Sequence, residues 1–258
     1  MQTTWKNPFE AGSETVRANA TKTLLIVAAI TIALNWVPGQ WGTYISAITY
    51  PIRLLVTFIH EGAHALVGLL TGGAVQSISV QPDGSGLTQT YLFGWLPAVL
   101  VASAGYLGAS LYGATLIGLL RRGVEARKLI LVTGVAVGLV TLGVLKGLIF
   151  TGNVFGLFWG VVLTAALLFA GLKMSRQAAG WTAAFIGVQC VLNALLDLKT
   201  LFTLTVSTWG GNDAANMASK TLIPAPVWAA LWIVLSLGML AFVLRPSRTP
   251  ALATRFAR

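Results

Sequence analysis

The chain has 258 residues, of which 56% are hydrophobic and only 9% are charged, and its formal net charge is +10. Soluble domains carry about 25% charged residues, so this composition excludes a water-soluble globular protein and predicts a polytopic membrane protein. No basic face with interleaved aromatic residues appears, which argues against nucleic acid as a partner. The basic residues instead cluster at the ends of apolar segments, as cytoplasmic loops do. These residues are Arg121, Arg122, Arg127, Lys128, Lys173, Arg176, Arg245 and Arg248.

The pattern of hydropathy divides the chain into three parts. Residues 1–22 are predicted to form a polar N-terminal tail, residues 23–245 a single transmembrane domain, and residues 246–258 a basic C-terminal tail. Seven apolar runs lie in the middle part, and each is predicted to be helical because open sheet edges cannot face lipid. The first run is short for a crossing, which needs about 20 residues. The fold class is therefore an all-α polytopic membrane protein with six to seven transmembrane helices. The runs cover residues 24–37, 45–70, 92–120, 129–145, 154–172, 181–206 and 227–244.

One segment between the second and third runs departs from the helical pattern. Residues 74–90 alternate apolar and polar positions and then turn at Pro82-Asp83-Gly84. This pattern predicts a short β-hairpin. A hairpin in a membrane protein must lie outside the hydrocarbon or be buried in protein.

Few ionisable residues lie deep within the apolar runs. Of the seven acidic residues only Glu61 and Asp197 do so, and the only two histidines, His60 and His64, lie beside Glu61. A carboxylate at the bilayer centre costs about 3 kcal/mol on the insertion scale, so such a residue indicates function when a partner is at hand. A purely structural explanation would be two histidines with all their hydrogen bonds made and a glutamate on a solvated helix face. This explanation fails because the segment is too apolar to form a solvated face.

The sequence HEGAH at 60–64 has the spacing H-E-x-x-H. Residues four apart lie on one face of a helix, so His60 and His64 can bind one Zn²⁺ ion. Glu61 is then close enough to activate a metal-bound water as a general base. The motif therefore predicts a zinc site with Glu61 as the catalytic residue.

A catalytic zinc ion takes three protein ligands and a water. With no third histidine and Cys190 elsewhere, the third ligand is expected to be a carboxylate. Asp197 is the preferred candidate because it lies as deep in its run as His60 does in its own. Asp213 is the rival, and it would need its loop, TWGGNDAAN, to fold back into the site.

Gln189, Asn193 and Asp197 are spaced four apart and form a polar stripe on an apolar helix. Such a stripe is expected to face the protein interior. Asn193 and Gln189 are therefore candidates for contacts to the metal ligands or to substrate. Hydrogen bonding between helices is an equally weighted explanation for both.

These residues resemble the M50 family of intramembrane metalloproteases, the site-2 protease group, and in particular its short M50B-like bacterial branch. The match rests on HEGAH at 60–64, PDGSGLTQT at 82–90, SAGYLGASLYG at 103–113 and LNALLDLKTLF at 192–202. The resemblance implies that His60, His64 and Asp197 bind zinc and that Glu61 activates water. The family's late motif has a proline before the aspartate and a glycine after it, whereas Asp197 is followed by Leu198.

The sequence therefore predicts an intramembrane zinc metalloprotease that hydrolyses peptide bonds of membrane-associated substrates. Its expected partners are a membrane-protein or peptide substrate and the lipid bilayer, and its expected location is a cell membrane, the bacterial cytoplasmic membrane. The hairpin at 74–90 offers an edge to which an extended substrate can add as a strand. The alternative is a non-proteolytic metal-binding membrane protein, a regulator or a transporter.

Overall fold

The computed structural model describes residues 26, 29, 39–205 and 212–245, without the side chains of 39–48 and 193–205. The two predicted tails and nearly all of the first apolar run lie outside these residues. The described part of the chain forms seven helices and two strands. They are α2 (Gly39–Leu70), β1 (Ala74–Val80), β2 (Gly86–Tyr91), α3 (Trp95–Arg121), α4 (Ala126–Thr151), α5 (Val154–Lys173), α6 (Arg176–Thr205), α7 (Asp213–Thr221) and α8 (Ala225–Leu244).

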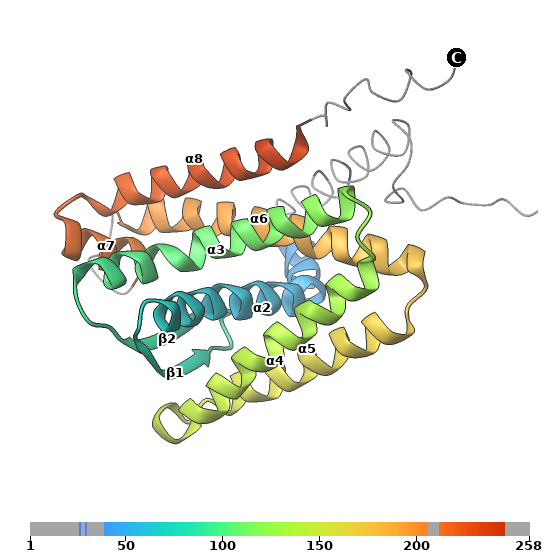
Figure 1. Cartoon of the computed structure of the whole chain (residues 1–258), viewed down its shortest axis with the longest axis horizontal. Coiled ribbons are helices and arrows are strands. Elements are labelled where there is room, and N and C mark those ends of the chain that lie inside the picture. The colour runs from blue at the N-terminus through green and yellow to red at the C-terminus, as the bar shows by residue number, and fades with distance from the viewer. Residues whose placement is uncertain (1–25, 27–28, 30–38, 206–211, 246–258) are drawn as a thin grey trace, which may run out of the picture.

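Helix α2 occupies the middle of the bundle (Figure 1). Helices α3, α6 and α8 pack together on one side of it, and the paired helices α4 and α5 lie on the other with the hairpin. The core between these groups is built from apolar side chains that are almost completely buried, including Leu54 and Phe58 of α2 and Ile130 of α4. Because α2 contacts α3 and α6 on one side and α4, α5 and both strands on the other, side chains on its inner faces are held by neighbours on both sides.

Five helices in the described part of the chain are long and apolar enough to cross a membrane, which makes this a multi-pass membrane protein. Large apolar side chains cover their outer faces; Ile149 is 89% exposed and Phe169 67%. Soluble proteins rarely leave such extensive apolar surface in water, whereas lipid solvates it. The predicted all-α membrane fold is confirmed, and the predicted six to seven crossings stay a prediction. The five spans are Thr49–Leu70, Trp95–Arg121, Ala126–Thr151, Val154–Lys173 and Ala225–Leu244.

The predicted hairpin is confirmed as an antiparallel pair, β1 with β2, in which Val80 lies opposite Gly86. Strand β1 is covered by α4 and by the α4–α5 turn. The amide of Asn153 bonds both polar groups of one residue, accepting from the N–H of Val80 (3.2 Å) and donating to its carbonyl (3.0 Å). Lys146 donates to the carbonyl of Val75 (2.7 Å). The hairpin is thus buried in protein on the β1 side, as a strand at membrane depth requires.

Helix α7 was not predicted, because its sequence was taken for a loop. Asn212 caps this nine-residue helix by accepting a hydrogen bond from the N–H of Ala215 (2.8 Å). Met217 is completely buried against α3 and α8, in a small cluster that includes Trp232. The indole of Trp95 donates to the carbonyl of Lys220 (2.7 Å). These contacts, rather than intrinsic stability, hold so short a helix in place, since isolated helices below about 12 residues are marginal in water.

Candidate metal centre

The side chains of His60 and His64 leave α2 on the same face, one helical turn apart. Their rings meet edge to face with centroids 4.8 Å apart, and their Nε2 atoms lie 3.1 Å apart. Both are largely buried. The predicted convergence of the two imidazoles is therefore present in the structure.

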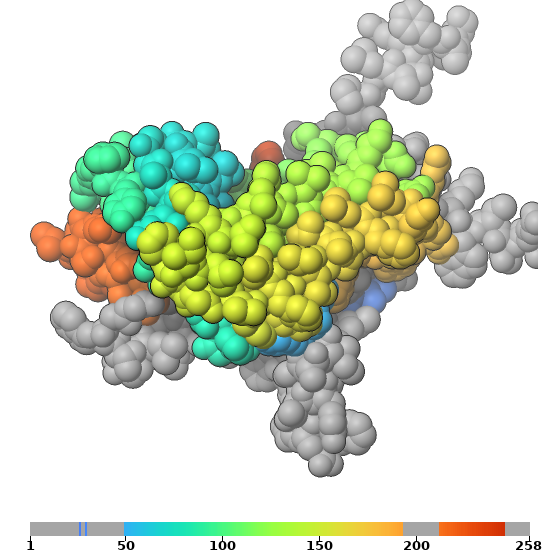
Figure 2. All heavy atoms as spheres, turned by 90° about the horizontal axis from the view of Figure 1, so that it is seen from below, coloured from blue at the N-terminus to red at the C-terminus, as the bar shows by residue number. Residues whose placement is uncertain are grey.

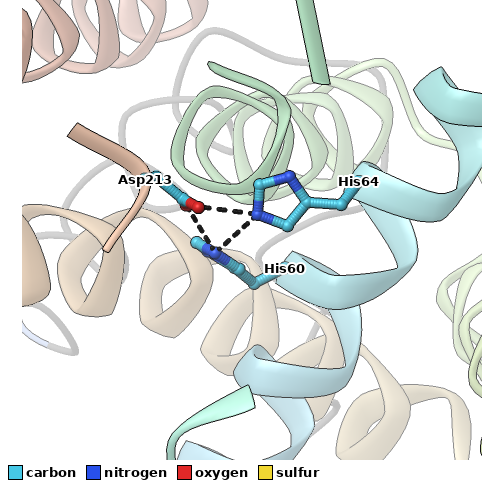
Figure 3. Close-up of side chains that lie close together, drawn as sticks. All are labelled: His60, His64 and Asp213. Carbon is cyan, nitrogen blue, oxygen red and sulfur yellow. Dashed lines mark hydrogen bonds and ion pairs between the residues drawn. The ribbon is translucent and has the colours of Figure 1, made fainter. Parts of the chain in front are cut away.

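Asp213, the first residue of α7, completes a triangle with the two rings (Figure 3). Its Oδ2 atom lies 3.2 Å from Nε2 of His60 and 3.1 Å from Nε2 of His64. A tetrahedral zinc site with bonds of about 2.0–2.1 Å separates its ligand atoms by about 3.3–3.4 Å. The three donor atoms thus already have nearly the mutual spacing that one zinc ion requires.

The orientation of the His64 ring also fits a metal. Its Nδ1 lies 2.6 Å from the carbonyl oxygen of Val101, so Nδ1 carries the proton and donates. Its Nε2 atom therefore faces Asp213 Oδ2 and Nε2 of His60, each 3.1 Å away, so that a single cation can contact all three atoms. A hydrogen bond from the other ring nitrogen is the usual support of a metal-binding histidine.

The floor of the site is made by α3. At Gly105 an added Cβ would overlap both imidazole rings, so only glycine lets α3 approach this closely. The next residue of α3 is Tyr106, whose ring packs edge to face on His60 with centroids 4.7 Å apart. Tyr106 in turn stacks on Trp232 of α8 (5.6 Å). Helices α3 and α8 therefore fix the positions of the rings.

Glu61 lies beside the triangle and is only 3% exposed. The hydroxyl of Thr88 donates to its Oε2 atom (2.6 Å) and also lies 3.1 Å from its backbone carbonyl. An added Cβ at Gly86 would come within 2.5 Å of Oε1, so β2 passes directly over this carboxylate. The hairpin therefore orients the residue that the motif singled out as the general base.

Burial by itself would raise the pKa of the Asp213 carboxyl group. His64 and His60 act against this through their charge and their hydrogen bonds, and the net result is a pKa below its ordinary range. Asp213 is therefore ionised at neutral pH, as a carboxylate ligand must be.

These groups line a cleft with a cavity volume of about 660 Å³ between α2, the hairpin, α3 and α7. Besides the triangle and Glu61, its wall includes Leu87 and Thr90 of β2 and the cations Arg53 and Lys220. Small-molecule and peptide sites are usually concave with a few convergent polar groups. Glu61 and the triangle therefore line the same cleft.

The predicted site residues have different outcomes. His60, Glu61 and His64 lie together in the cleft, and the rival carboxylate Asp213 joins them. The backbone of α6 is described at Asn193 and Asp197, but both side chains lie outside the described part. Gln189 is buried in α6.

Sequence reasoning missed Thr88, Gly105 and Tyr106, which support the site from the hairpin and from α3. A signal for α7 was present: Asn212 followed by Asp213 is a helix start, and an acid in the first turn suits the positive end of a helix. For Gly105 the sequence shows one small residue among many, so nothing distinguishes it from an ordinary packing glycine.

A comparison with known families gives one match, to the Peptidase M50B-like family, over residues 25–243. No curated protein and no solved structure matches the chain. Because the match covers most of the chain, and because the H-E-x-x-H helix, the hairpin and the buried donors all lie within it, this protein belongs to the M50B-like peptidases. That family is one of metalloendopeptidases, and the M50 family to which it belongs is zinc-dependent.

Proposed function

We propose that this protein is an intramembrane zinc metalloprotease that hydrolyses peptide bonds of membrane-associated substrates. The observation that carries the proposal is the triangle of His60 Nε2, His64 Nε2 and Asp213 Oδ2 beside the buried carboxylate of Glu61. The resemblance of this chain to the bacterial M50B-like branch favours the bacterial cytoplasmic membrane as the location of the protein.

We infer that Asp213, rather than Asp197, is the third zinc ligand. Three ligands of the His-His-carboxylate type leave one position of a tetrahedral ion open for catalysis. A zinc ion held there would polarise a scissile carbonyl and make a water molecule more acidic. The spacing of the donors and the hydrogen bond from His64 Nδ1 to Val101 support this assignment.

Glu61 acts as the general base and then as the general acid. Its carboxylate takes a proton from the attacking water and delivers it to the amide nitrogen that leaves. The Thr88 hydroxyl holds Oε2 in place, so the carboxylate does not need to reorganise during the reaction. Burial excludes bulk water, which strengthens these interactions in a low dielectric.

The substrate is expected to bind in an extended conformation beside β2. A helical amide is shielded by its neighbours, so a membrane helix must unwind before cleavage. Strand β1 already forms hydrogen bonds with Asn153 and packs against α4. In contrast, Leu87, Thr88 and Thr90 of β2 line the cleft. Main-chain hydrogen bonds to β2 would present the scissile bond to Glu61.

The decisive experiment combines metal content with turnover. Glu61→Gln is expected to retain one zinc per chain while cleavage of a tagged single-span reporter falls by at least about 10²-fold, because general base catalysis contributes about 10²–10⁴-fold. Asp213→Asn is expected to lose both zinc and cleavage.

Asp197→Asn is the matched control and is expected to retain zinc. Zinc loss in Asp197→Asn with retention in Asp213→Asn would reject Asp213 as the ligand. Stoichiometric zinc in the wild type without cleavage of any membrane-spanning reporter would favour the non-proteolytic alternative.

A further inference from the structure

The cations of this protein gather at one end of the bundle. Among the lysines and arginines whose side chains are described, seven of ten lie where α3, α5 and α8 finish and where α4 and α6 begin. One acid accompanies them, Glu125, which pairs with Lys128 (3.6 Å). The other three described cations, Arg53, Lys146 and Lys220, line the cleft or support the hairpin. The seven residues, here named the basic end, are Arg121, Arg122, Arg127, Lys128, Lys173, Arg176 and Arg245.

Direct contacts between helix ends hold the basic end together. Arg121 donates to the carbonyls of Val243 and Arg245 (3.2 Å for the second), at the end of α8. Arg127 donates to the carbonyl of Gly171 (3.2 Å) in the last turn of α5. Cations at helix C-termini are favoured by the helix dipole and by the unpaired carbonyls there. The grouping is thus a property of the packed bundle.

The metal centre lies toward the opposite end of the bundle. Its distance from the basic end can be estimated along α3. This helix has 27 residues and is about 40 Å long, close to the membrane thickness with headgroups. It begins at Trp95, an exposed aromatic of the kind found at membrane interfaces, and ends at Arg121. Its contacts to the metal centre, Val101 and Gly105, lie about 9–15 Å from Trp95 and about 24–30 Å from Arg121.

The two remaining landmarks of the site agree with this placement. Helix α7, which carries Asp213, and the hairpin lie at the end of the bundle away from the α3–α4 and α5–α6 turns (Figure 1). In the view turned by 90°, the segments around residues 120 and 175 again lie opposite α7 and the hairpin (Figure 2). The cleft therefore belongs to the half of the molecule that lacks the basic end.

We propose that the basic end lies against the anionic headgroups of the cytoplasmic leaflet, so that the metal centre and its cleft face the non-cytoplasmic half of the membrane. Lysine and arginine beside membrane spans are retained on the cytoplasmic side and are attracted to anionic lipid headgroups. Given the proposed function, the substrates are then membrane segments whose scissile bond lies in the non-cytoplasmic half. The orientation itself is independent of whether the site is catalytic.

Two matched serine-to-cysteine variants test this orientation. Ser219 of α7 and Ser175 of the α5–α6 turn are both exposed, and each lies at one end of the bundle. Cys190 is completely buried and is replaced in both by Cys190→Ala to remove background. Labelling in detergent first establishes that both introduced thiols react.

A membrane-impermeant maleimide added to intact cells is expected to label Ser219→Cys and to leave Ser175→Cys unlabelled until the membrane is permeabilised. The reverse pattern, or labelling of both before permeabilisation, overturns the proposal. Combining Arg122→Gln, Lys128→Gln and Arg176→Gln is expected to reduce labelling of Ser219→Cys in intact cells at least about twofold, because the orienting charge is lost. Unchanged labelling in that variant would also overturn it.

These outcomes separate the two proposals. Correct labelling with no bound zinc would reject the protease and leave the orientation intact. Reversed labelling with zinc bound by His60, His64 and Asp213 would do the opposite.

Discussion

Helices α2 and α7 contribute to the same triangle, but they are held in different ways. Helix α2 has 32 residues and packs along much of its length against α3, α4 and the hairpin. Helix α7 has nine residues and depends on its Asn212 cap, on buried Met217 and on hydrogen bonds from Trp95 and Trp228. The difference shows that His60 and His64 are fixed by the fold as a whole, whereas Asp213 is fixed by a few separable contacts.

The largest expected effect comes from α3, which forms the floor of the site and packs against both α2 and α7. Gly105→Ala would place a methyl group within 2.4 Å of ring atoms of both histidines, so we expect loss of stoichiometric zinc and a fall in cleavage of more than about 10²-fold. Metal analysis of the purified protein measures the first and reporter cleavage the second.

Gly118→Ala on the same helix is the control. Its Cβ would meet Val243 at 3.5 Å, an ordinary contact, and zinc content is expected to stay at the wild-type level. Full zinc occupancy in Gly105→Ala would contradict the placement of the rings.

A pair of core truncations separates α7 from α2. Met217→Ala removes the buried anchor of α7 and is expected to cost about 2–5 kcal/mol locally, which weakens zinc binding while the melting temperature of the metal-free bundle changes little. Phe58→Ala in α2 is expected to cost about 3–5 kcal/mol and to lower that melting temperature. Zinc titration and thermal unfolding of both variants measure the difference. Equal loss of melting temperature in the two would show that α7 does not dock separately.

The smallest effect is expected at the cap of α7. Asn212→Ala removes the acceptor for the N–H of Ala215, which costs about 1 kcal/mol and should weaken zinc binding by roughly fivefold. Asn212→Ser retains a capping oxygen and is expected to restore most of the affinity. If serine and alanine behave alike in the zinc titration, the cap does not contribute to the position of Asp213.

Much of this site could be predicted from the sequence, because the cost of polar groups in lipid makes them conspicuous. His60, Glu61 and His64 are read from helical spacing alone, and the hairpin from alternation and turn residues. The choice between Asp197 and Asp213 could not be made that way. Depth within an apolar run favoured Asp197, whereas the position of Asp213 depends on how α7 docks onto α3 and α8, which is a tertiary contact without a local signature.

The separation of the donors along the chain has a consequence for biogenesis. Asp213 follows His64 by 149 positions, and α3 to α6 lie between them. While the ribosome is still synthesising α6, the inserted helices hold two imidazoles and no partner carboxylate from α7. A truncated or stalled product therefore lacks the assembled triangle, and the three donor atoms come together only after α7 has been synthesised and has docked.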